Sequence, residues 1–202
     1  EKYIIPNVYF EEVIYQGPEL FSFIFNNFGF NSNYMSAIQS ENENKIADVK
    51  TEIIQNADDF YKDYNAEIDK NIMAAMLKIY ISDVPSEFHP EYLKKIAKKY
   101  KNNFTKFTDK YYAKSPFTSK KKFVSWVNNS LSEANLNKDE VYNLATDFLN
   151  LYIQSVMMPQ QSSQANFGRG MRLFVDGLNK MGANKASDAN STMRVTFGNV
   201  LS

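Results

Sequence analysis

One histidine and a group of aspartates are the residues in this sequence that could do acid–base chemistry. They are His89 and Asp58, Asp59, Asp63 and Asp69. A zinc or di-iron site needs several histidine or carboxylate–histidine ligands, and this sequence has one histidine. A serine triad needs a histidine and a positioned nucleophile, often in a Gly-x-Ser-x-Gly elbow, and this sequence lacks that elbow. We therefore expect no metal, no cofactor and no catalysis within these residues. His89 is interpreted as a surface or helix-capping residue and the aspartates as a solvated helix face, with paired-carboxylate chemistry as the alternative.

The composition favours helices. The chain has 202 residues, enough for one substantial core, and 13 Tyr and 16 Phe supply large packing surfaces. Seven Gly and six Pro are too few for a protein built from strands and turns. There is no cysteine, which excludes disulfides and thiolate ligands. The longest apolar run, residues 21–25, falls far short of the roughly 20 residues that span a bilayer, so we predict no membrane span.

Charge is distributed unevenly along the chain. Residues 1–70 carry 13 acids against 5 bases, whereas residues 94–122 carry 11 lysines against one aspartate. The simplest interpretation is that acidic and basic helices pack as neighbours or expose solvated faces. Binding of single-stranded nucleic acid is a sharper alternative, because aromatic residues lie among the lysines. The aromatics are Tyr100, Phe104, Phe107, Tyr111 and Tyr112. They are at helical spacing and are expected to face inward, so we predict no nucleic-acid partner.

Apolar spacing and the positions of proline and glycine predict an all-α, multi-helix domain. Helices are expected over residues 7–16, 18–28, 35–64 or 41–64, 66–80, 90–101, 104–113, 119–127, 137–158 and 167–181. Ser119 is the expected cap of the helix over residues 119–127. Residues 159–166, PQQSSQAN, are predicted to be a polar linker, and Asn137 is predicted to cap the helix that precedes it.

The segment from Asp58 to Tyr80 is predicted to be the central corner of the fold. Asn65 is its expected N-cap. An apolar stripe follows and is expected to face the core: Ile68, Ile72, Ala75, Met76 and Ile79. Residues 21–28 are apolar nearly all round, which predicts either a buried element or one that lies against a missing neighbour.

The C-terminal end changes character. Residues 192–200, TMRVTFGNV, alternate in the period of a β-strand. A lone strand cannot satisfy its own backbone groups, so its partners are expected on a portion of the protein not included here. The N-terminus, EKYIIPNVYF, lacks an initiating Met and a signal-peptide pattern, and we expect the chain to be an internal segment.

This C-terminal stretch resembles a known family. Residues 174–178, FVDGL, followed by residues 187–200, SDANSTMRVTFGNV, are similar to the bacterial serine dipeptidyl-peptidase family that includes dipeptidyl-peptidases 7 and 11. The family pattern is close to Pro-Asp-Ala-Asn-Ser-Thr-Met-Arg-x-Thr-Tyr-Gly-x-Val, and Ser187 and Phe197 depart from it. Residues 59–64, DFYKDY, and 73–78, MAAMLK, are also similar to the family. Residues 98–101, KKYK, and Lys114-Ser115 followed by Phe117 resemble it more loosely.

The resemblance implies a fold and an activity. Such enzymes join a chymotrypsin-like double β-barrel, which holds a His-Asp-Ser triad, to an inserted helical domain that covers the active-site cleft, and they release dipeptides from peptide N-termini. By resemblance, residues 1–186 are the helical domain, and residues 187–202 form a junction and a strand that re-enters the peptidase β-barrel. The triad, and the asparagine that holds the substrate's amino terminus, are expected outside these 202 residues. The family implies a periplasmic or cell-surface location.

The junction supplies the candidate site residues. Asp188, Asn190 and Arg194 are predicted to couple the helical domain to the barrel, since Asx side chains bond turn amides and arginine can bridge domains. The alternative is that they only hold a surface turn. The residues that bind substrate are not identified by the sequence. A stand-alone helical peptide- or protein-binding module, using an exposed aromatic groove at residues 21–28, is the competing function.

Overall fold

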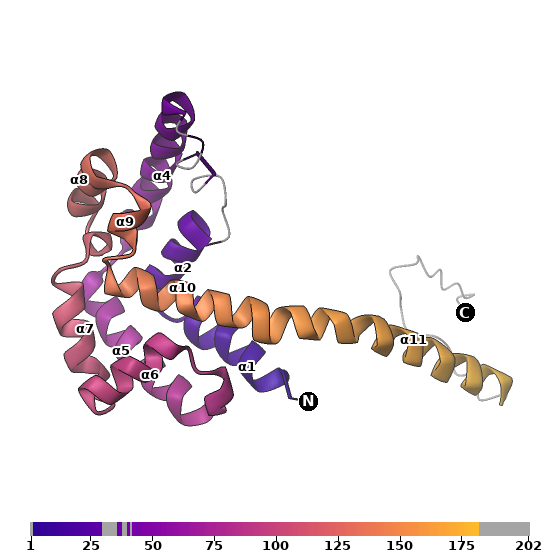
Figure 1. The fold of residues 1–202 in the computed structure, drawn as a ribbon. Coiled ribbons are helices and arrows are strands. Elements are labelled where there is room, and N and C mark those ends of the chain that lie inside the picture. Colours follow the sequence, from indigo (N-terminus) through magenta and orange to yellow (C-terminus); the bar gives the residue numbers. More distant parts are fainter. Residues whose placement is uncertain (1, 30–35, 38–39, 41, 182–202) are drawn as a thin grey trace, which may run out of the picture. The chain divides into compact units, whose positions relative to one another are not determined.

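A computed structural model describes residues 2–29, 36–37, 40 and 42–181 of the chain (Figure 1). These residues are helical with short connections, and they contain no β-strand. The predicted strand at residues 192–200 and the predicted junction residues Asp188, Asn190 and Arg194 lie outside the described residues. The chain divides into two compact units, Glu1–Gln160 and Gln161–Ser202, which are considered separately below.

The first unit begins with short α- and π-helical segments and continues through longer helices. Its α-helices are α1 (Ile4–Tyr9), α2 (Glu19–Ile24), α4 (Glu43–Asp63), α5 (Ala66–Asp83), α6 (Glu91–Tyr100), α7 (Phe104–Tyr112), α8 (Lys120–Ser130), α9 (Glu133–Leu136) and α10 (Glu140–Tyr152). Its π- and 3₁₀-helical turns are η1 (Phe10–Tyr15), η2 (Phe25–Gly29), η3 (Ser86–Phe88), η4 (Pro116–Thr118) and η5 (Ile153–Met157). The helix α11 (Met158–Lys180) follows.

Helix α10 is the central element of the first unit. It packs against α2, α6, α7, η1 and η2, and Figure 1 shows it crossing between them. The apolar spacing of the sequence predicts a core stripe of Val141, Leu144, Phe148, Leu151 and Ser155. The first three are buried and confirm it, whereas Leu151 and Ser155 are half-buried. The predicted cap is wrong: Asp139, not Asn137, accepts from the first backbone amides of the helix.

The spacing of apolar residues along the outer helix α4 predicts a seam against a partner helix, and the structure confirms it: Ile46, Val49, Ile53, Ala57 and Phe60. Ile53 and Ala57 are buried, while Ile46, Val49 and Phe60 are half-buried on the same side. This side packs against α8. The next helix, α5, starts where Asn65 was expected to cap it, with the Asn65 Oδ1 accepting from the Glu67 and Ile68 amides at 3.0 and 3.2 Å.

The predicted inner face of α5 is wrong. Ile68 and Ile79 are exposed, and Ala75 is exposed as well, whereas the buried residues are Asp69, Met73, Ala74, Leu77 and Tyr80. The two stripes differ by a rotation of about 100°, one residue along the helix. The helix is apolar on several sides, so periodicity alone did not identify the side that faces the core.

The aromatic segment at residues 21–28 belongs to the core. Phe21, Phe23, Phe25 and Phe28 are all at most 5% exposed. Phe21 and Phe25 lie at 6.0 Å between ring centroids, and Phe21 also packs against Phe148 of α10 at 6.0 Å. The structure therefore contradicts an exposed aromatic groove at this position and supports the prediction of a buried element.

The predicted linker at residues 159–166 is helical. It forms the first turns of α11, which begins at Met158 directly after the π-helical turn η5. Proline lacks an amide proton and disturbs the hydrogen bonding of a regular α-helix. The π-helical turn η5 directly before Pro159 already changes that bonding, so Pro159 does not end the helical path as the sequence suggested.

Candidate functional site

His89 is held inside the first unit and is not a surface residue. It is 8% exposed, and its Nε2 lies 2.7 Å from the Val84 carbonyl oxygen. A carbonyl only accepts, so Nε2 carries the proton in this contact. Burial lowers the pKa of His89 below its ordinary value, although the bond to Val84 opposes the shift. The ring serves as a structural bridge between the end of α5 and the turn before α6, which corrects the surface or capping assignment.

The four clustered aspartates divide into two kinds. Asp58, Asp59 and Asp63 are exposed, as predicted for a solvated face. Asp69 is fully buried, against that prediction. The sequence carries no signal that separates Asp69 from the others, except that it shares the helical stripe of Met73 and Leu77.

Four donors surround the Asp69 carboxylate. They are the backbone amides of Glu19 at 2.7 Å and Leu20 at 3.3 Å, and the hydroxyls of Tyr64 at 3.1 Å and Tyr112 at 2.8 Å. Glu19 and Leu20 are the first residues of α2, so Asp69 satisfies the amides of a neighbouring helix's N-terminus. Burial raises the pKa of Asp69, and these four hydrogen bonds oppose the rise. The group is an anchor for α2 and has no free oxygen for catalysis.

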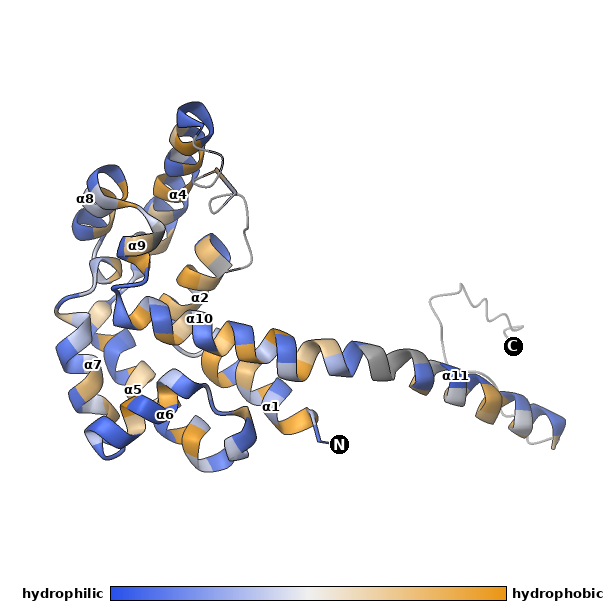
Figure 2. Cartoon of the chain, viewed as in Figure 1, coloured by the Kyte–Doolittle hydropathy of each residue, from blue (hydrophilic) through white to orange (hydrophobic). Residues whose placement is uncertain are grey.

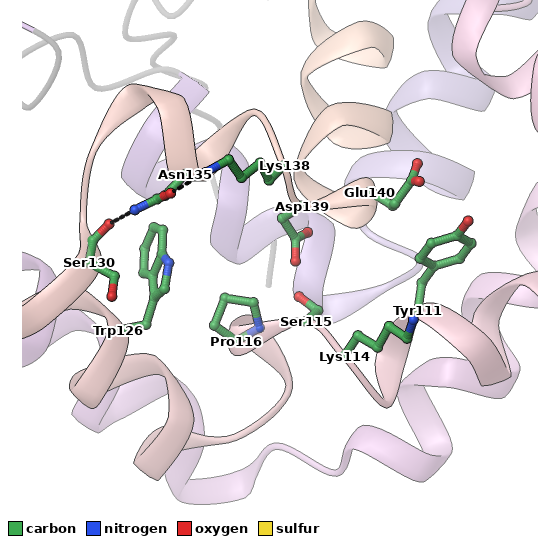
Figure 3. Close-up of a pocket in the computed structure, with 10 residues that line it drawn as sticks. All are labelled: Tyr111, Lys114, Ser115, Pro116, Trp126, Ser130, Asn135, Lys138, Asp139 and Glu140. Atoms are coloured by element: carbon green, nitrogen blue, oxygen red, sulfur yellow. Dashed lines mark hydrogen bonds between the residues drawn. The ribbon is translucent and has the colours of Figure 1, made fainter.

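A hollow of about 570 Å³ lies where α7, η4, α8 and α10 meet (Figure 3). This size is within the usual range for small-molecule and peptide pockets. It is lined by aromatic, cationic, acidic and hydroxyl side chains: Tyr111, Lys114, Ser115, Pro116, Trp126, Ser130, Asn135, Lys138, Asp139 and Glu140.

The polar floor of this hollow consists of helix caps. The Ser115 hydroxyl accepts from the Phe117 amide at 3.3 Å and is also hydrogen bonded to Asp139. The Asp139 Oδ1 accepts from the Val141 and Tyr142 amides at 2.9 and 2.8 Å. Burial raises the pKa of Asp139 above its ordinary value. Both groups are occupied in starting helical turns, and neither is paired with a histidine that could activate Ser115 as a nucleophile.

The sides of the hollow are better suited to binding than to chemistry. Trp126 packs on Phe117 at 5.5 Å between ring centroids and turns an edge to the hollow. Lys138 donates to Asn135 at 3.0 Å, and Asn135 donates in turn to the Ser130 carbonyl at 2.7 Å, which fixes this wall (Figure 3). An aromatic surface flanked by ammonium and carboxylate groups can hold a short peptide segment by contact and charge.

A second hollow, of about 470 Å³, is rich in amides and lies between the first helices and α4. Asn27 is 4% exposed, donates to the Phe23 carbonyl at 2.8 Å and accepts from Asn56 at 3.1 Å. Asp59 also lines it, on the exposed side. Asn26, at the edge of the same hollow, accepts from the Tyr15 hydroxyl at 3.1 Å. These amides join neighbouring helices and are not acid–base groups.

The basic segment is confirmed as a packed element. Four of the five aromatics are buried, as the helical spacing predicted, and are not available as a stacking platform for bases: Phe104, Phe107, Tyr111 and Tyr112. The fifth, Tyr100, is half-buried against the core. Lys120 pairs with Asp58 at 3.0 Å, which joins the basic α8 to the acidic α4. The two charged regions of the sequence are thus neighbours in this part of the fold.

The described residues offer neither a metal site nor a membrane-spanning helix. No group of three or more His, Asp or Glu side chains among them is arranged to hold a metal ion. None of their helices is long and apolar enough to cross a membrane.

Comparisons with known proteins identify relatives of this chain. The sequence model of the family described as Peptidase S46 matches residues 1–202. The chain is 26% identical to dipeptidyl-peptidase 7 of Capnocytophaga gingivalis over 82% of its length, and 30% identical to dipeptidyl-peptidase 7 of Porphyromonas gingivalis over 76%. It is 25% identical to the Asp/Glu-specific dipeptidyl-peptidase of Flavobacterium psychrophilum over 98% of its length. The matched regions cover 22%, 22% and 27% of those relatives, so the chain spans about a quarter of their length.

Proposed function

Because this chain belongs to the peptidase S46 family, a family with dipeptidyl-peptidase members, we propose that it is the helical part of a serine-type dipeptidyl-peptidase and covers the active-site cleft without cleaving peptides itself. The observation that carries the proposal is the match of the family model to residues 1–202, together with the match of 82–98% of the chain to about a quarter of the length of proteins named as dipeptidyl-peptidases. The triad and its barrel then belong to the remaining part of the protein.

The described side chains support a non-catalytic role. A serine triad needs a histidine whose ring can accept a proton from the nucleophile. The single histidine of this sequence, His89, directs its Nε2 at the Val84 carbonyl and is buried between α5 and α6. The most enclosed carboxylate, Asp69, is occupied by four donors. These groups hold helices together and leave no acid–base pair to act on a peptide bond.

A helical cover acts by excluding substrates. If it closes one end of the cleft, only a peptide with a free N-terminus can place its first two residues at the triad. Chain ends are thereby selected over internal bonds, and dipeptides are released. The packed first unit, with α10 at its centre, has the rigidity that such a steric role requires.

The test is dipeptide release by the family-length protein that contains this chain. Unblocked and N-acetylated peptides of the same sequence are incubated with that protein and with the 202-residue chain, and the products are identified by mass spectrometry. We expect dipeptides from the unblocked peptides with the longer protein only. Release by the 202-residue chain alone would contradict the non-catalytic role, and the absence of release by the longer protein would contradict the proposed activity.

The junction and the location remain part of this proposal. Asp188, Asn190 and Arg194, assigned by resemblance, are proposed to couple the helical domain, residues 1–186, to a peptidase β-barrel of the same protein. Asn190→Ala in the family-length protein should lower its melting temperature or its turnover; unchanged values of both would remove the junction role. A periplasmic or cell-surface location is proposed on the same resemblance, and cell fractionation with an antibody to the chain tests it.

The competing function, a stand-alone binding module, has lost its main support. It depended on an exposed aromatic groove at residues 21–28, and those phenylalanines are buried.

A further inference from the structure

The part of α11 that lies in the second unit exposes an unusual number of large apolar side chains. The exposed fractions of Phe174 and Leu173 are 61% and 64%, and that of Met181 is 81%. Figure 2 shows hydrophobic positions recurring along this helix. The full set of exposed apolar residues here is Phe167, Met171, Leu173, Phe174, Val175, Leu178 and Met181.

Five of these residues form a seam. Their spacing is four, three, four and three, which places them within about 40° of one line along the helix at roughly 100° per residue. We call Phe167, Met171, Phe174, Leu178 and Met181 the α11 seam.

The charged residues of the same helix lie opposite the seam. These residues are Arg169, Arg172, Asp176 and Lys180. At roughly 100° per residue, they lie within about 40° of the line on the side of the helix opposite the seam. Lys180 pairs with Asp176 at 2.7 Å along that charged face. Leu173 is the exposed apolar residue that lies toward this side. The helix is therefore two-faced, and its seam residues are exposed by 36–81%.

Glycines border the seam. A Cβ atom added at Gly168, Gly170 or Gly177 would meet no atom within 4 Å. Each glycine costs a helix about 1 kcal/mol relative to alanine. Nothing in the described structure requires this cost, whereas a surface packed on the seam could use the missing side chains to approach the helix closely.

A second copy of the chain fits this surface poorly. Helices that pair as coiled coils carry charged residues beside the apolar seam, which fix the partner and its direction. The positions beside the α11 seam are Gly168, Gly170, Val175 and Gly177, and the charges lie on the far side. The seam is also only two heptads long, shorter than the roughly three to four heptads that indicate a coiled coil.

We propose that the α11 seam packs against the remaining part of the same peptidase polypeptide. The matched relatives are about four times as long as the region that this chain covers, so a large part of a family-length protein is available as a tethered partner. A tether raises the effective concentration of the two surfaces and removes the need for self-complementary charges. The inference rests on the proposed function, since it takes the chain to be one part of a longer dipeptidyl-peptidase.

Thiol labelling tests the proposal without depending on a loss of stability. The sequence has no cysteine, so Phe174→Cys and Leu173→Cys each add a single reporter to this region. The two positions are adjacent and start from nearly equal exposure, but only Phe174 is in the seam. Maleimide labelling at each position is followed by peptide mass spectrometry in the 202-residue chain and in the family-length protein.

In the 202-residue chain, we expect the two cysteines to be labelled at equal rates. In the family-length protein, we expect Phe174→Cys to be labelled at least about tenfold more slowly than Leu173→Cys, because thiol reactivity follows exposure. Equal rates in the family-length protein would overturn the proposal. Protection of Phe174→Cys that grows with protein concentration would also overturn it, in favour of a second copy. The failure of the wild-type longer protein to release dipeptides would contradict the proposed function and leave the labelling result to decide the seam on its own.

Discussion

The Asp69 carboxylate shows how one buried residue fixes the arrangement of several helices. It lies on α5, accepts from the start of α2 and from Tyr112 of α7, and also accepts from Tyr64 at the corner between α4 and α5. A buried carboxylate is costly unless donors surround it, and here four donors do so. The same residue determines which side of α5 faces inward.

We expect Asp69→Ala to lower the free energy of unfolding by about 3–5 kcal/mol, because four buried donors lose their acceptor at once. Urea unfolding followed by the fluorescence of Trp126 measures this loss. Asp63→Ala, an exposed aspartate near the same corner, is the control and should change the free energy by less than about 0.5 kcal/mol. Similar small values for both variants would show that the Asp69 cluster is not an anchor.

The free energy of unfolding should depend on pH through His89. Burial lowers its pKa in the folded state, so the unfolded chain takes up the proton first as the pH falls below the ordinary value of about 6.5. The contribution of His89 to stability is therefore complete above that pH and is lost as the pH falls toward the lowered pKa. His89→Gln can keep a donor near the Val84 carbonyl but does not titrate.

The measurement is urea unfolding of the wild type and of His89→Gln at pH 7.5 and pH 5.5. Carboxylates titrate in both proteins and cancel in the comparison. The wild type should lose more free energy of unfolding between these pH values than the variant does. Equal losses would mean that the ring is protonated as readily in the fold as in the unfolded chain.

Gly17 controls the passage from η1 to α2 at the scale of elements. A Cβ atom at this position would lie 2.3 Å from the Val13 carbonyl oxygen and 3.1 Å from the Met76 Cγ. The first contact is with backbone, which cannot move aside without shifting the π-helical turn. Gly17→Ala should therefore cost about 1–3 kcal/mol of stability, in the range of overpacked cores.

Thermal unfolding followed by circular dichroism checks this expectation, with Gly168→Ala as the control. No atom lies within 4 Å of a Cβ at Gly168, so that substitution should keep the melting temperature and increase the helical signal slightly. A Gly17→Ala protein as stable as the wild type would show that the turn adapts to a side chain.

The elements also show where sequence reasoning worked and where it could not. Caps at Asn65 and Ser119 and the core stripe of α10 were predictable, because the signals are local. The inner face of α5 was not, since Asp69 is buried by a contact 50 residues away with the amide of Glu19. The helical path through Pro159 was missed because the π-helical turn before it leaves no mark in the apolar period.

At the scale of the whole molecule, the family could be identified from the sequence, but the candidate pocket could not. The resemblance depended on short motifs in order along the chain, and the match over residues 1–202 confirms it. The Trp126 pocket joins residues from α7, η4, α8 and α10, whose spatial proximity no local pattern encodes. The junction residues Asp188, Asn190 and Arg194 remain predictions.

The division into two units predicts what can be removed. Every buried hydrophobic residue of the described structure lies before Gln161, and the last is Val156. The exposed seam residues of α11 contribute no buried area to this core. A chain that ends after Gln160 should therefore unfold cooperatively with a melting temperature within about 2 °C of that of the 202-residue chain.

Calorimetry of the two chains measures the difference, and a chain that ends after Leu131 is the control. The control lacks α10, whose Val141, Leu144 and Phe148 fill the centre of the first unit, and it should show no cooperative transition. A large loss of stability on removing residues 161–202 would mean that they support the core. An unchanged transition would show that the core does not need the exposed apolar side of α11 or its three glycines. It would then support packing of this side against the rest of the peptidase.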